Sequence, residues 1–252
     1  TTKSCLGALC NVKGRVISSF VVSKLEEGFA LIGPKEMLLK TEEVLTKYSP
    51  FYKVKFNQNL GYFFYGIRRN HLKSLYGKDF SEEGNTIRLG KNQFIYYLEK
   101  EFILAICDLE DSPKLLDKVK VEDSFSNWFL DDLEHFNIEI MGEISEKYTP
   151  HELNYDLTNR IDFDKGCYTG QEVIARMHYR AKNLPRISLA ESSNKDLEPN
   201  MAICNLKNIK VGNLIKVVNL PTKSFCLVST KEKNLYTSLK VRETNSSLDF
   251  IK

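Results

Sequence analysis

The stretch KGCYTGQE, residues 165–172, runs directly into the apolar and basic sequence VIARMHYR, residues 173–180. Thr169 and Glu172 have the spacing of a capping box, in which the threonine hydroxyl and the glutamate carboxylate each accept a backbone N–H at the helix start. The pattern predicts an amphipathic helix that begins at Gly170. Its predicted buried face consists of Val173, Ile174, Met177 and Ala181.

Cys167 lies just before this predicted helix, close to Lys165. The partial positive charge of a helix N-terminus and a neighbouring lysine both favour the thiolate, so we predict a lowered pKa for the Cys167 thiol. A sharp turn between two glycines would present the thiol on a loop, where functional groups are often found. The alternative is that Cys167 is a small buried apolar residue beside a helix cap. These residues alone leave both interpretations open.

The composition is that of a globular protein. The chain has 252 residues, of which 42% are hydrophobic, and no apolar run is long enough to cross a membrane. Its net charge of +3 is too balanced for a dedicated nucleic-acid binder. The six cysteines form no C-x-x-C pair and have no histidine at ligand spacing, so we expect reduced thiols, no metal site and a cytoplasmic location.

Residue periodicity predicts mixed helices and strands, followed by a β-rich end. Strands are expected at residues 16–22, 28–32, 52–56, 93–98 and 102–107, the last two as a hairpin. Helices are expected at residues 34–48, 71–76, 124–136 and from residue 112 onward. Residues 148–164 should form a long ordered loop. After Arg180, short alternating stretches between turn residues predict a small antiparallel β-domain.

The 165–172 stretch, continued by Ala175, Arg176 and Arg180, resembles the signature of the YgfZ family, relatives of the glycine-cleavage aminomethyltransferase. Two further stretches carry the resemblance: TPHELN at 149–154 is similar to the loop before the signature, and CNVKGR at 10–15 is similar to a glycine turn of the family. The signature residues are Lys165, Gly166, Cys167, Tyr168, Gly170, Gln171, Glu172 and Arg176.

The resemblance implies an α+β, multi-domain ring with a small antiparallel β-barrel at its C-terminal end. We expect a folate-binding lobe at 1–110, a helical and loop continuation carrying the signature at 111–182, and the barrel at 183–252. The family has a further N-terminal segment with an opening strand and helix, so the chain is expected to be shortened or trimmed at that end.

The resemblance also implies a function. The family binds tetrahydrofolate and acts in iron–sulfur cluster assembly or repair, and thereby in tRNA modification. The expected partners are folate and, indirectly, iron–sulfur enzymes such as tRNA-thiolating enzymes, without direct tRNA contact and without a membrane. Cys167 is the expected functional thiol.

The family's folate-contacting tryptophan matches Trp128, and its acidic residue six positions later matches Glu134. A pterin can stack on an indole, and its N–H edge can pair with a carboxylate. The alternatives are a solvated helix charge at Glu134 and a purely apolar role for Trp128, in a stripe with Phe125, Phe129, Leu133 and Phe136. Where the family has Gly and Pro after the glutamate, this chain has Phe136 and Ile138.

Other functions remain open. A folate-dependent aminomethyltransferase would use an aspartate where this chain has Ser18 and Ser19, and a hydroxyl cannot do the work of that carboxylate, so we lean against an enzyme. Cys167 could instead act directly as a thiol, with His178 as a helper base. A basic run could contact RNA, bind a phosphate or the anionic tail of folate, or stay solvated. It comprises Arg176, His178, Arg180, Lys182 and Arg186 around Tyr179. We expect His71, His135, His151 and His178 to be surface residues.

Overall fold

A computed structural model describes residues 2–24, 28–58, 61–77, 85–89, 93–96, 101–107, 117, 125–180 and 182–251. The chain forms two compact units, and each is described by itself. Unit 1 comprises Thr1–Gly7 and Phe20–Asp131, and unit 2 comprises Ala8–Ser19 and Asp132–Lys252. The first two strands and helix α5 therefore each contribute residues to both units.

A seven-stranded sheet has the order β3-β2-β1-β5-β6-β7-β4, in which the pairs β2–β3, β1–β5, β5–β6, β6–β7 and β7–β4 are antiparallel. Its strands are β1 (Thr2–Cys10), β2 (Val16–Lys24), β3 (Phe29–Ile32), β4 (Phe63–Arg68), β5 (Asn85–Leu89), β6 (Gln93–Tyr96) and β7 (Phe102–Cys107). The predicted hairpin is confirmed, because β6 and β7 pair antiparallel. The strands predicted near 16–22 and 28–32 are confirmed as β2 and β3.

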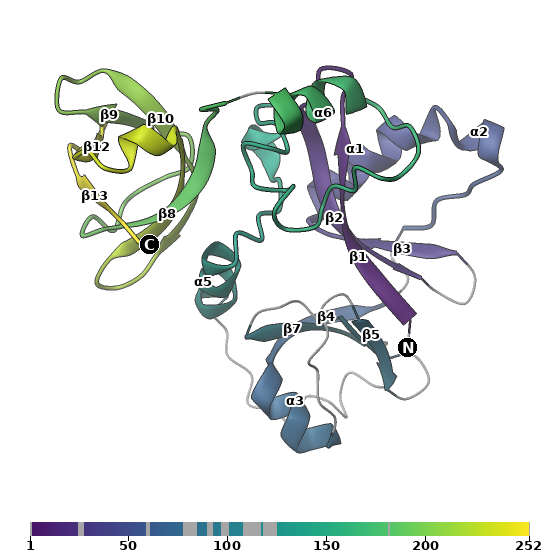
Figure 1. Ribbon diagram of the computed structural model, residues 1–252. Helices are drawn as coiled ribbons and strands as arrows, with labels where there is room; N and C mark the ends of the chain where they lie inside the picture. The colour runs from purple at the N-terminus through teal and green to yellow at the C-terminus, as the bar shows by residue number, and fades with distance from the viewer. Residues whose placement is uncertain are drawn as a thin grey trace. The chain divides into compact units, whose positions relative to one another are not determined.

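Among the described residues of unit 1, helices α1 (Lys35–Thr46), α2 (Ser49–Tyr52) and α3 (Arg69–Tyr76) accompany this sheet, and the first part of α5 also belongs to this unit. Leu72 of α3 is fully buried against Ile67 of β4 and Ile103 of β7, and Figure 1 shows α3 next to these strands. The helices predicted at 34–48 and 71–76 are confirmed with small shifts of their ends. The strand predicted at 52–56 is wrong, because Tyr52 ends α2 and Lys53 follows in the left-handed region.

Helix α5 (Ser126–Glu134) corrects the predicted apolar stripe. Leu133 is buried as expected, but Phe125 and Phe129 are exposed, while Asp131 and Asp132 are buried. Asp131 is buried because its carboxylate accepts the N–H groups of Glu101 and Phe102 at 3.0 and 3.1 Å. The helix predicted from residue 112 lies almost wholly outside the described residues.

In unit 2, a long segment without regular strands joins the short 3₁₀ helix η1 (Gly142–Ile144) to helix α6 (Gln171–Arg180). Residues 148–164 form successive turns with several buried side chains, including Leu153 and Tyr155. The Tyr155 hydroxyl donates to the Ile138 carbonyl oxygen at 2.7 Å. The prediction of a long ordered loop is confirmed.

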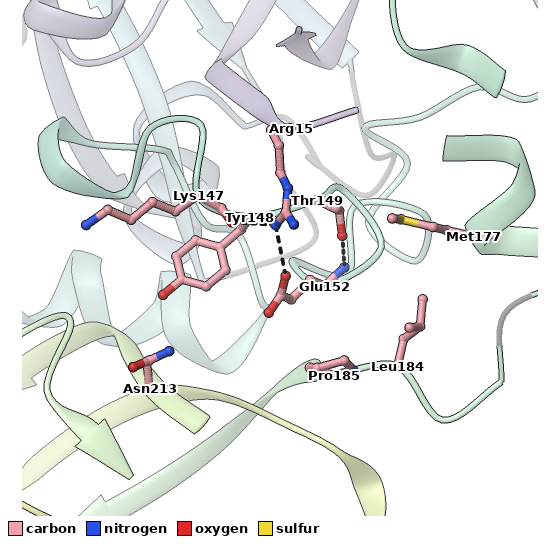
Figure 2. A pocket seen from close by; sticks show the side chains of 9 residues that line it. All are labelled: Arg15, Lys147, Tyr148, Thr149, Glu152, Met177, Leu184, Pro185 and Asn213. Atoms are coloured by element: carbon pink, nitrogen blue, oxygen red, sulfur yellow. Dashed lines mark hydrogen bonds and ion pairs between the residues drawn. The ribbon is translucent and has the colours of Figure 1, made fainter. Parts of the chain in front are cut away.

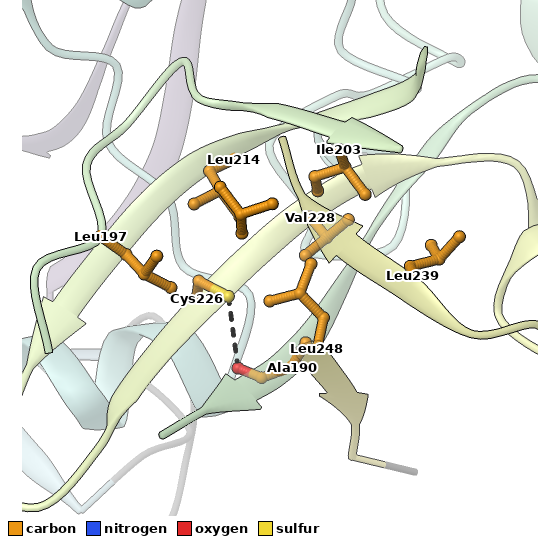
Figure 3. Close-up of a cluster of buried hydrophobic side chains, with 9 residues drawn as sticks. Ala190, Leu197, Ile203, Leu214, Cys226, Val228, Leu239 and Leu248 are labelled. Carbon is orange, nitrogen blue, oxygen red and sulfur yellow. Dashed lines mark hydrogen bonds between the residues drawn. The ribbon is translucent and has the colours of Figure 1, made fainter. Parts of the chain in front are cut away.

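The C-terminal part of unit 2 is a closed barrel with the order β10-β11-β8-β13-β12-β9. Its strands are β8 (Arg186–Ser192), β9 (Ala202–Asn205), β10 (Lys210–Asn219), β11 (Ser224–Thr230), β12 (Leu239–Val241) and β13 (Ser247–Phe250), and the short 3₁₀ helix η2 (Glu232–Asn234) follows β11. Its six neighbouring strand pairs are antiparallel. Figure 3 shows Leu214, Cys226 and Val228 among the side chains that fill its interior.

The mixed helices and strands and the C-terminal antiparallel barrel confirm the predicted fold class. The boundaries predicted at residues 110 and 182 stay predictions. Among the residues that the structure describes, no helix has the length and apolar character needed to cross a bilayer.

Candidate functional site

The turn between β1 and β2 is held by Asn11. Its side-chain oxygen accepts the N–H groups of Lys13 and Arg15, both at 3.0 Å, and its amide donates to the Glu146 carboxylate at 2.9 Å. Gly14 completes the turn with a φ of 68°, in the left-handed region where glycine is favoured. The sequence CNVKGR thus forms a turn that is hydrogen-bonded to Glu146, far along the chain.

The 165–172 stretch packs directly on this turn. A Cβ built at Gly170 would lie 2.6 Å from the Asn11 carbonyl oxygen, and one at Gly14 would lie 3.1 Å from Val173 of α6. Two glycines, far apart in sequence, therefore allow the turn and the start of α6 to approach each other.

The predicted start of α6 needs a correction. The helix begins at Gln171 rather than Gly170, and the Gln171 side-chain oxygen accepts the Tyr168 N–H at 3.0 Å. The capping side chain is thus Gln171, where a capping box of Thr169 and Glu172 was expected. On the predicted buried face, Ile174 is buried, and Val173 and Met177 are partly buried, while Ala181 lies outside the described residues.

The signature residues lie mostly in solvent. Lys165, Gly166, Cys167, Gln171, Glu172 and Arg176 are exposed. The Lys165 ammonium lies 4.7 Å from the ring centroid of Tyr168, in cation–π contact. The exposure of Cys167 contradicts its alternative interpretation as a buried apolar residue. The roles predicted for the signature residues stay predictions.

The 149–154 loop also meets the Asn11 turn. The Val16 N–H donates to the Tyr148 carbonyl oxygen at 2.9 Å, and the Glu146 N–H donates to the Val16 carbonyl oxygen at 2.7 Å. Arg15 lies 3.9 Å from the Glu152 carboxylate. All three stretches that carry the family resemblance therefore converge within unit 2.

A second cluster in unit 2 centres on Asp156, whose side chain is 2% exposed. Arg186 binds it through both guanidinium nitrogens, at 2.9 and 2.7 Å. The Nδ1 atoms of His178 and His151 lie 3.3 and 3.6 Å from the same carboxylate. His178 also stacks on Phe163, with ring centroids 4.1 Å apart. The cluster ties the loop, α6 and β8 together.

Charge and burial shift two pKa values in this cluster. Burial lowers the pKa of His151, and the Arg186 charge adds to that effect. Burial alone would raise the pKa of Asp156, but hydrogen bonds and charge from Arg186 outweigh it, so that this pKa is lowered. Asp156 is therefore a carboxylate and His151 neutral at neutral pH.

The cluster corrects two expectations from the sequence. His151, expected at the surface, has a side chain only 12% exposed. The basic run is not continuous, because His178 and Arg186 are engaged by Asp156, whereas Arg176, Arg180 and Lys182 are exposed. His71 and His135 are exposed, as expected.

Unit 2 also contains a pocket of about 430 Å³, shown in Figure 2. The pocket is lined by Arg15, Lys147, Tyr148, Thr149, Glu152, Met177, Leu184, Pro185 and Asn213. Glu152 accepts the Ser229 hydroxyl at 2.7 Å, and its own N–H donates to Thr149. Burial raises the pKa of Glu152.

The two residues predicted to contact folate lie on α5. Trp128, in unit 1, is half-buried, and a Cβ at Gly66 would lie 2.4 Å from its ring. Phe102 meets the indole edge-on, with centroids 6.0 Å apart. Glu134, in unit 2, is exposed. Neither the indole nor the carboxylate is fully buried, so both can be reached from solvent. The two folate contacts stay predictions.

Ser18 and Ser19, at the position where a transferase would have its aspartate, are fully buried. The Ser19 hydroxyl oxygen accepts the Ile140 N–H at 2.8 Å. This hydroxyl therefore has a structural partner in the protein interior.

Sequence reasoning missed Asp156 and the pocket. Asp156 lies in a loop without periodicity, and its partners come from positions up to 30 residues away in sequence. The only signal in the sequence was the TPHELN stretch itself, which contributes Thr149 and Glu152 to the pocket and His151 to the cluster.

The chain is 30% identical over 204 residues to the tRNA-modifying protein YgfZ of Yersinia enterocolitica. The matched region covers 77% of this chain and 62% of the Yersinia protein. It is 30% identical over 229 residues to the protein of the same name from Buchnera aphidicola, with 85% of this chain and 71% of that protein covered. The chain thus spans less than two thirds of the Yersinia protein. No protein-family model matches the chain.

Among solved structures, the glycine cleavage system aminomethyltransferase T from Bartonella henselae is similar, with a TM-score of 0.69 and 11% identity. The similarity covers 99% of this chain and 75% of that one. At this identity it shows a shared fold and no more.

Proposed function

The chain belongs to the YgfZ family, and from this premise we propose that it is a tetrahydrofolate-binding accessory protein that supports iron–sulfur cluster assembly or repair and, through it, tRNA modification. Its relatives are named as tRNA-modifying proteins. In this proposal the partners are folate and iron–sulfur enzymes such as tRNA-thiolating enzymes, the effect on tRNA is indirect, and the protein acts in the cytoplasm.

The observation that carries the proposal is the exposure of Cys167 on an anchored turn. Gly170, three residues after Cys167, packs against the Asn11 turn, so the stretch that carries the exposed thiol is anchored at this end. An exposed thiol can reach a partner protein, which a buried one cannot do. Cys167 is therefore the residue on which the proposed activity depends.

Two observations support folate binding through α5. Trp128 lies against Gly66, so that its indole approaches the β4 backbone closely while it stays partly exposed. The exposed Glu134 carboxylate could accept hydrogen bonds from the N–H edge of a pterin. When bound, tetrahydrofolate would supply one-carbon chemistry or act as a sensed ligand.

Aminomethyl transfer is not part of the proposal. The hydroxyl of Ser19 already accepts a backbone N–H in the interior, and a serine hydroxyl cannot provide the charge of the missing aspartate. A coupled assay that detects aminomethyltransferase activity above background would refute this point.

The thiol role is tested by complementation of an iron–sulfur enzyme defect. We expect Cys167→Ala to fold normally and bind tetrahydrofolate like the parent, yet to fail in complementation. Cys5→Ala, which removes the other exposed thiol, should complement fully. Full complementation by Cys167→Ala would overturn the thiol role.

Folate binding is tested by calorimetry and by the fluorescence of Trp128, which is the only tryptophan. We expect tetrahydrofolate to quench this emission and Trp128→Phe and Glu134→Gln to weaken binding. Glu232→Gln, an exposed glutamate of the barrel, should leave binding unchanged. Saturable binding without a change in emission would exclude Trp128 as the pterin platform.

A further inference from the structure

The pocket in unit 2 has a polar side and an apolar side. Figure 2 shows Tyr148 and Asn213 on one side of the Arg15–Glu152 pair, and Met177, Leu184 and Pro185 on the other. An arrangement of this kind suits a small molecule with an apolar group at one end and a polar group at the other.

The polar side offers hydrogen-bonding groups that the protein does not use. Among the described residues, no hydrogen bond or ion pair involves the Lys147 ammonium, the Tyr148 hydroxyl or the Asn213 side-chain amide. Burial and the nearby Glu152 charge raise the pKa of Tyr148 to about 12, so its hydroxyl keeps its proton and can donate. All three residues line the pocket. Three donors favour an acceptor, and the ammonium favours an anionic one.

The Glu152 carboxylate restricts which anion fits. It lines the pocket between the two sides, and its nearest cation, Arg15, is 3.9 Å away. A second negative charge close to this carboxylate is costly, so a singly charged carboxylate fits better than a doubly charged phosphate. Glu152 can in turn accept an N–H group of the ligand.

We propose that this pocket binds a small carboxylate whose N–H group pairs with Glu152 and whose apolar group packs on Met177, Leu184 and Pro185. The carboxylate lies with Lys147, Tyr148 and Asn213. This assignment is independent of the proposed folate contacts on α5, because no residue is shared between the two.

The probe for the test is N-benzoylglycine, which has an aromatic ring, one amide N–H and one carboxylate. Binding is followed by NMR of the protein labelled with ¹³C at its methionine methyl groups, since the chain has only four methionines. Met177 lines the apolar side, whereas Met37 is 2% exposed in unit 1 and serves as the internal reference. The Met177 signal is assigned with Met177→Leu.

We expect a saturable shift of the Met177 signal and no shift of the Met37 signal. The neutral N-benzoylglycinamide should bind about tenfold more weakly, because it lacks the charge that pairs with Lys147. No saturable shift of Met177, or equal affinity for the acid and the amide, overturns the proposal. Tighter binding of benzyl phosphate would replace the carboxylate with a phosphate and likewise overturn it.

The variants Tyr148→Phe and Lys147→Gln should each weaken N-benzoylglycine binding by about threefold to tenfold. Tyr236→Phe and Lys231→Gln alter exposed residues of the barrel outside the pocket and should leave the affinity unchanged. Thermal unfolding of each variant checks that the fold is retained. Unchanged affinity in both pocket variants would show that the carboxylate does not lie on the polar side.

Discussion

Gly170 lies so close to Asn11 that a Cβ at position 170 would be 2.6 Å from the Asn11 carbonyl oxygen. Gly170 also has a φ of 82°, which a residue with a side chain rarely adopts. Space and backbone conformation thus both require glycine where the 165–172 stretch meets the Asn11 turn.

Gly170→Ala should therefore lower the free energy of unfolding by about 2–4 kcal/mol, as the sum of backbone strain and a main-chain clash. Gly166→Ala is the matched control in the same stretch, because a Cβ at Gly166 would meet no atom within 4 Å. We expect the control to change stability by less than about 0.5 kcal/mol. Urea denaturation of both variants checks this, and equal losses would contradict the packing described.

The family resemblance and the local pattern predicted different parts of this site. The three matching stretches were identified in the sequence, and the turn, loop and helix they form are present. Their convergence was not predicted, because it depends on contacts such as Gly170 with Asn11 and Arg15 with Glu152, between residues far apart in the chain. The local pattern also gave the wrong cap, because at this helix start the Gln171 side chain accepts the Tyr168 N–H, a bond that the Thr169 and Glu172 spacing does not predict.

Phe136 occupies a position that favours glycine. It follows α5 with a φ of 51°. Its N–H donates to the Leu133 carbonyl oxygen, and the Asn137 N–H donates to the Asp132 carbonyl oxygen. These two bonds form a Schellman motif, whose left-handed residue is usually glycine. Backbone geometry thus favours glycine at this position, where the family resemblance gives a glycine and this chain has Phe136.

We expect Phe136→Gly to be more stable than Phe136→Ala by about 1 kcal/mol, because alanine is strained in the left-handed region. At Glu134, the last residue of α5, the order should reverse, with alanine more stable than glycine by about 0.5–1 kcal/mol. Thermal or urea unfolding of the four variants measures both differences. The same order at both positions would argue against the left-handed conformation of Phe136.

The burial of polar residues was the hardest feature to predict. Asp131, Asp132 and Asp156 resemble solvated charges in the sequence, and the apolar Phe125 and Phe129 resemble core residues. The structure buries the aspartates and exposes the two phenylalanines, because a carboxylate can be buried where backbone N–H groups or an arginine satisfy it. Such partners come from distant segments, so periodicity within a helix or loop does not reveal them.

The His151 environment predicts a loss of stability in mild acid. Its pKa in the folded protein is lowered from the usual 6.5 by burial and by Arg186. Below pH 6.5 the unfolded chain therefore binds a proton that the folded protein resists. The free energy of unfolding falls as the pH falls, until the pH reaches the pKa of His151 in the folded protein.

The melting temperature should decrease as the pH is lowered from about 7.5 to about 5.5, and His151→Gln should flatten this decrease. His71→Gln, at an exposed histidine of unit 1, should keep the slope of the parent. A parent slope retained in His151→Gln would assign the acid sensitivity to other groups.

Thiol alkylation can test the placement of Cys167 directly. Cys167 and Cys5 are exposed, Cys10 is half-buried, and Cys107, Cys204 and Cys226 are buried. Burial raises the pKa of Cys10 to about 11 and that of Cys226 to about 12, so these two thiols are almost wholly protonated at neutral pH. Iodoacetamide should therefore modify Cys167 and Cys5 first, as measured by mass spectrometry of peptides over time.

Cys167→Ala should remove one of the two fast-reacting thiols, while Cys226→Ala should leave the fast phase intact. A Cys167 peptide that stays unmodified while Cys5 reacts to completion would show that the turn does not present its sulfur to solvent, and the proposed thiol role would then lose its structural basis.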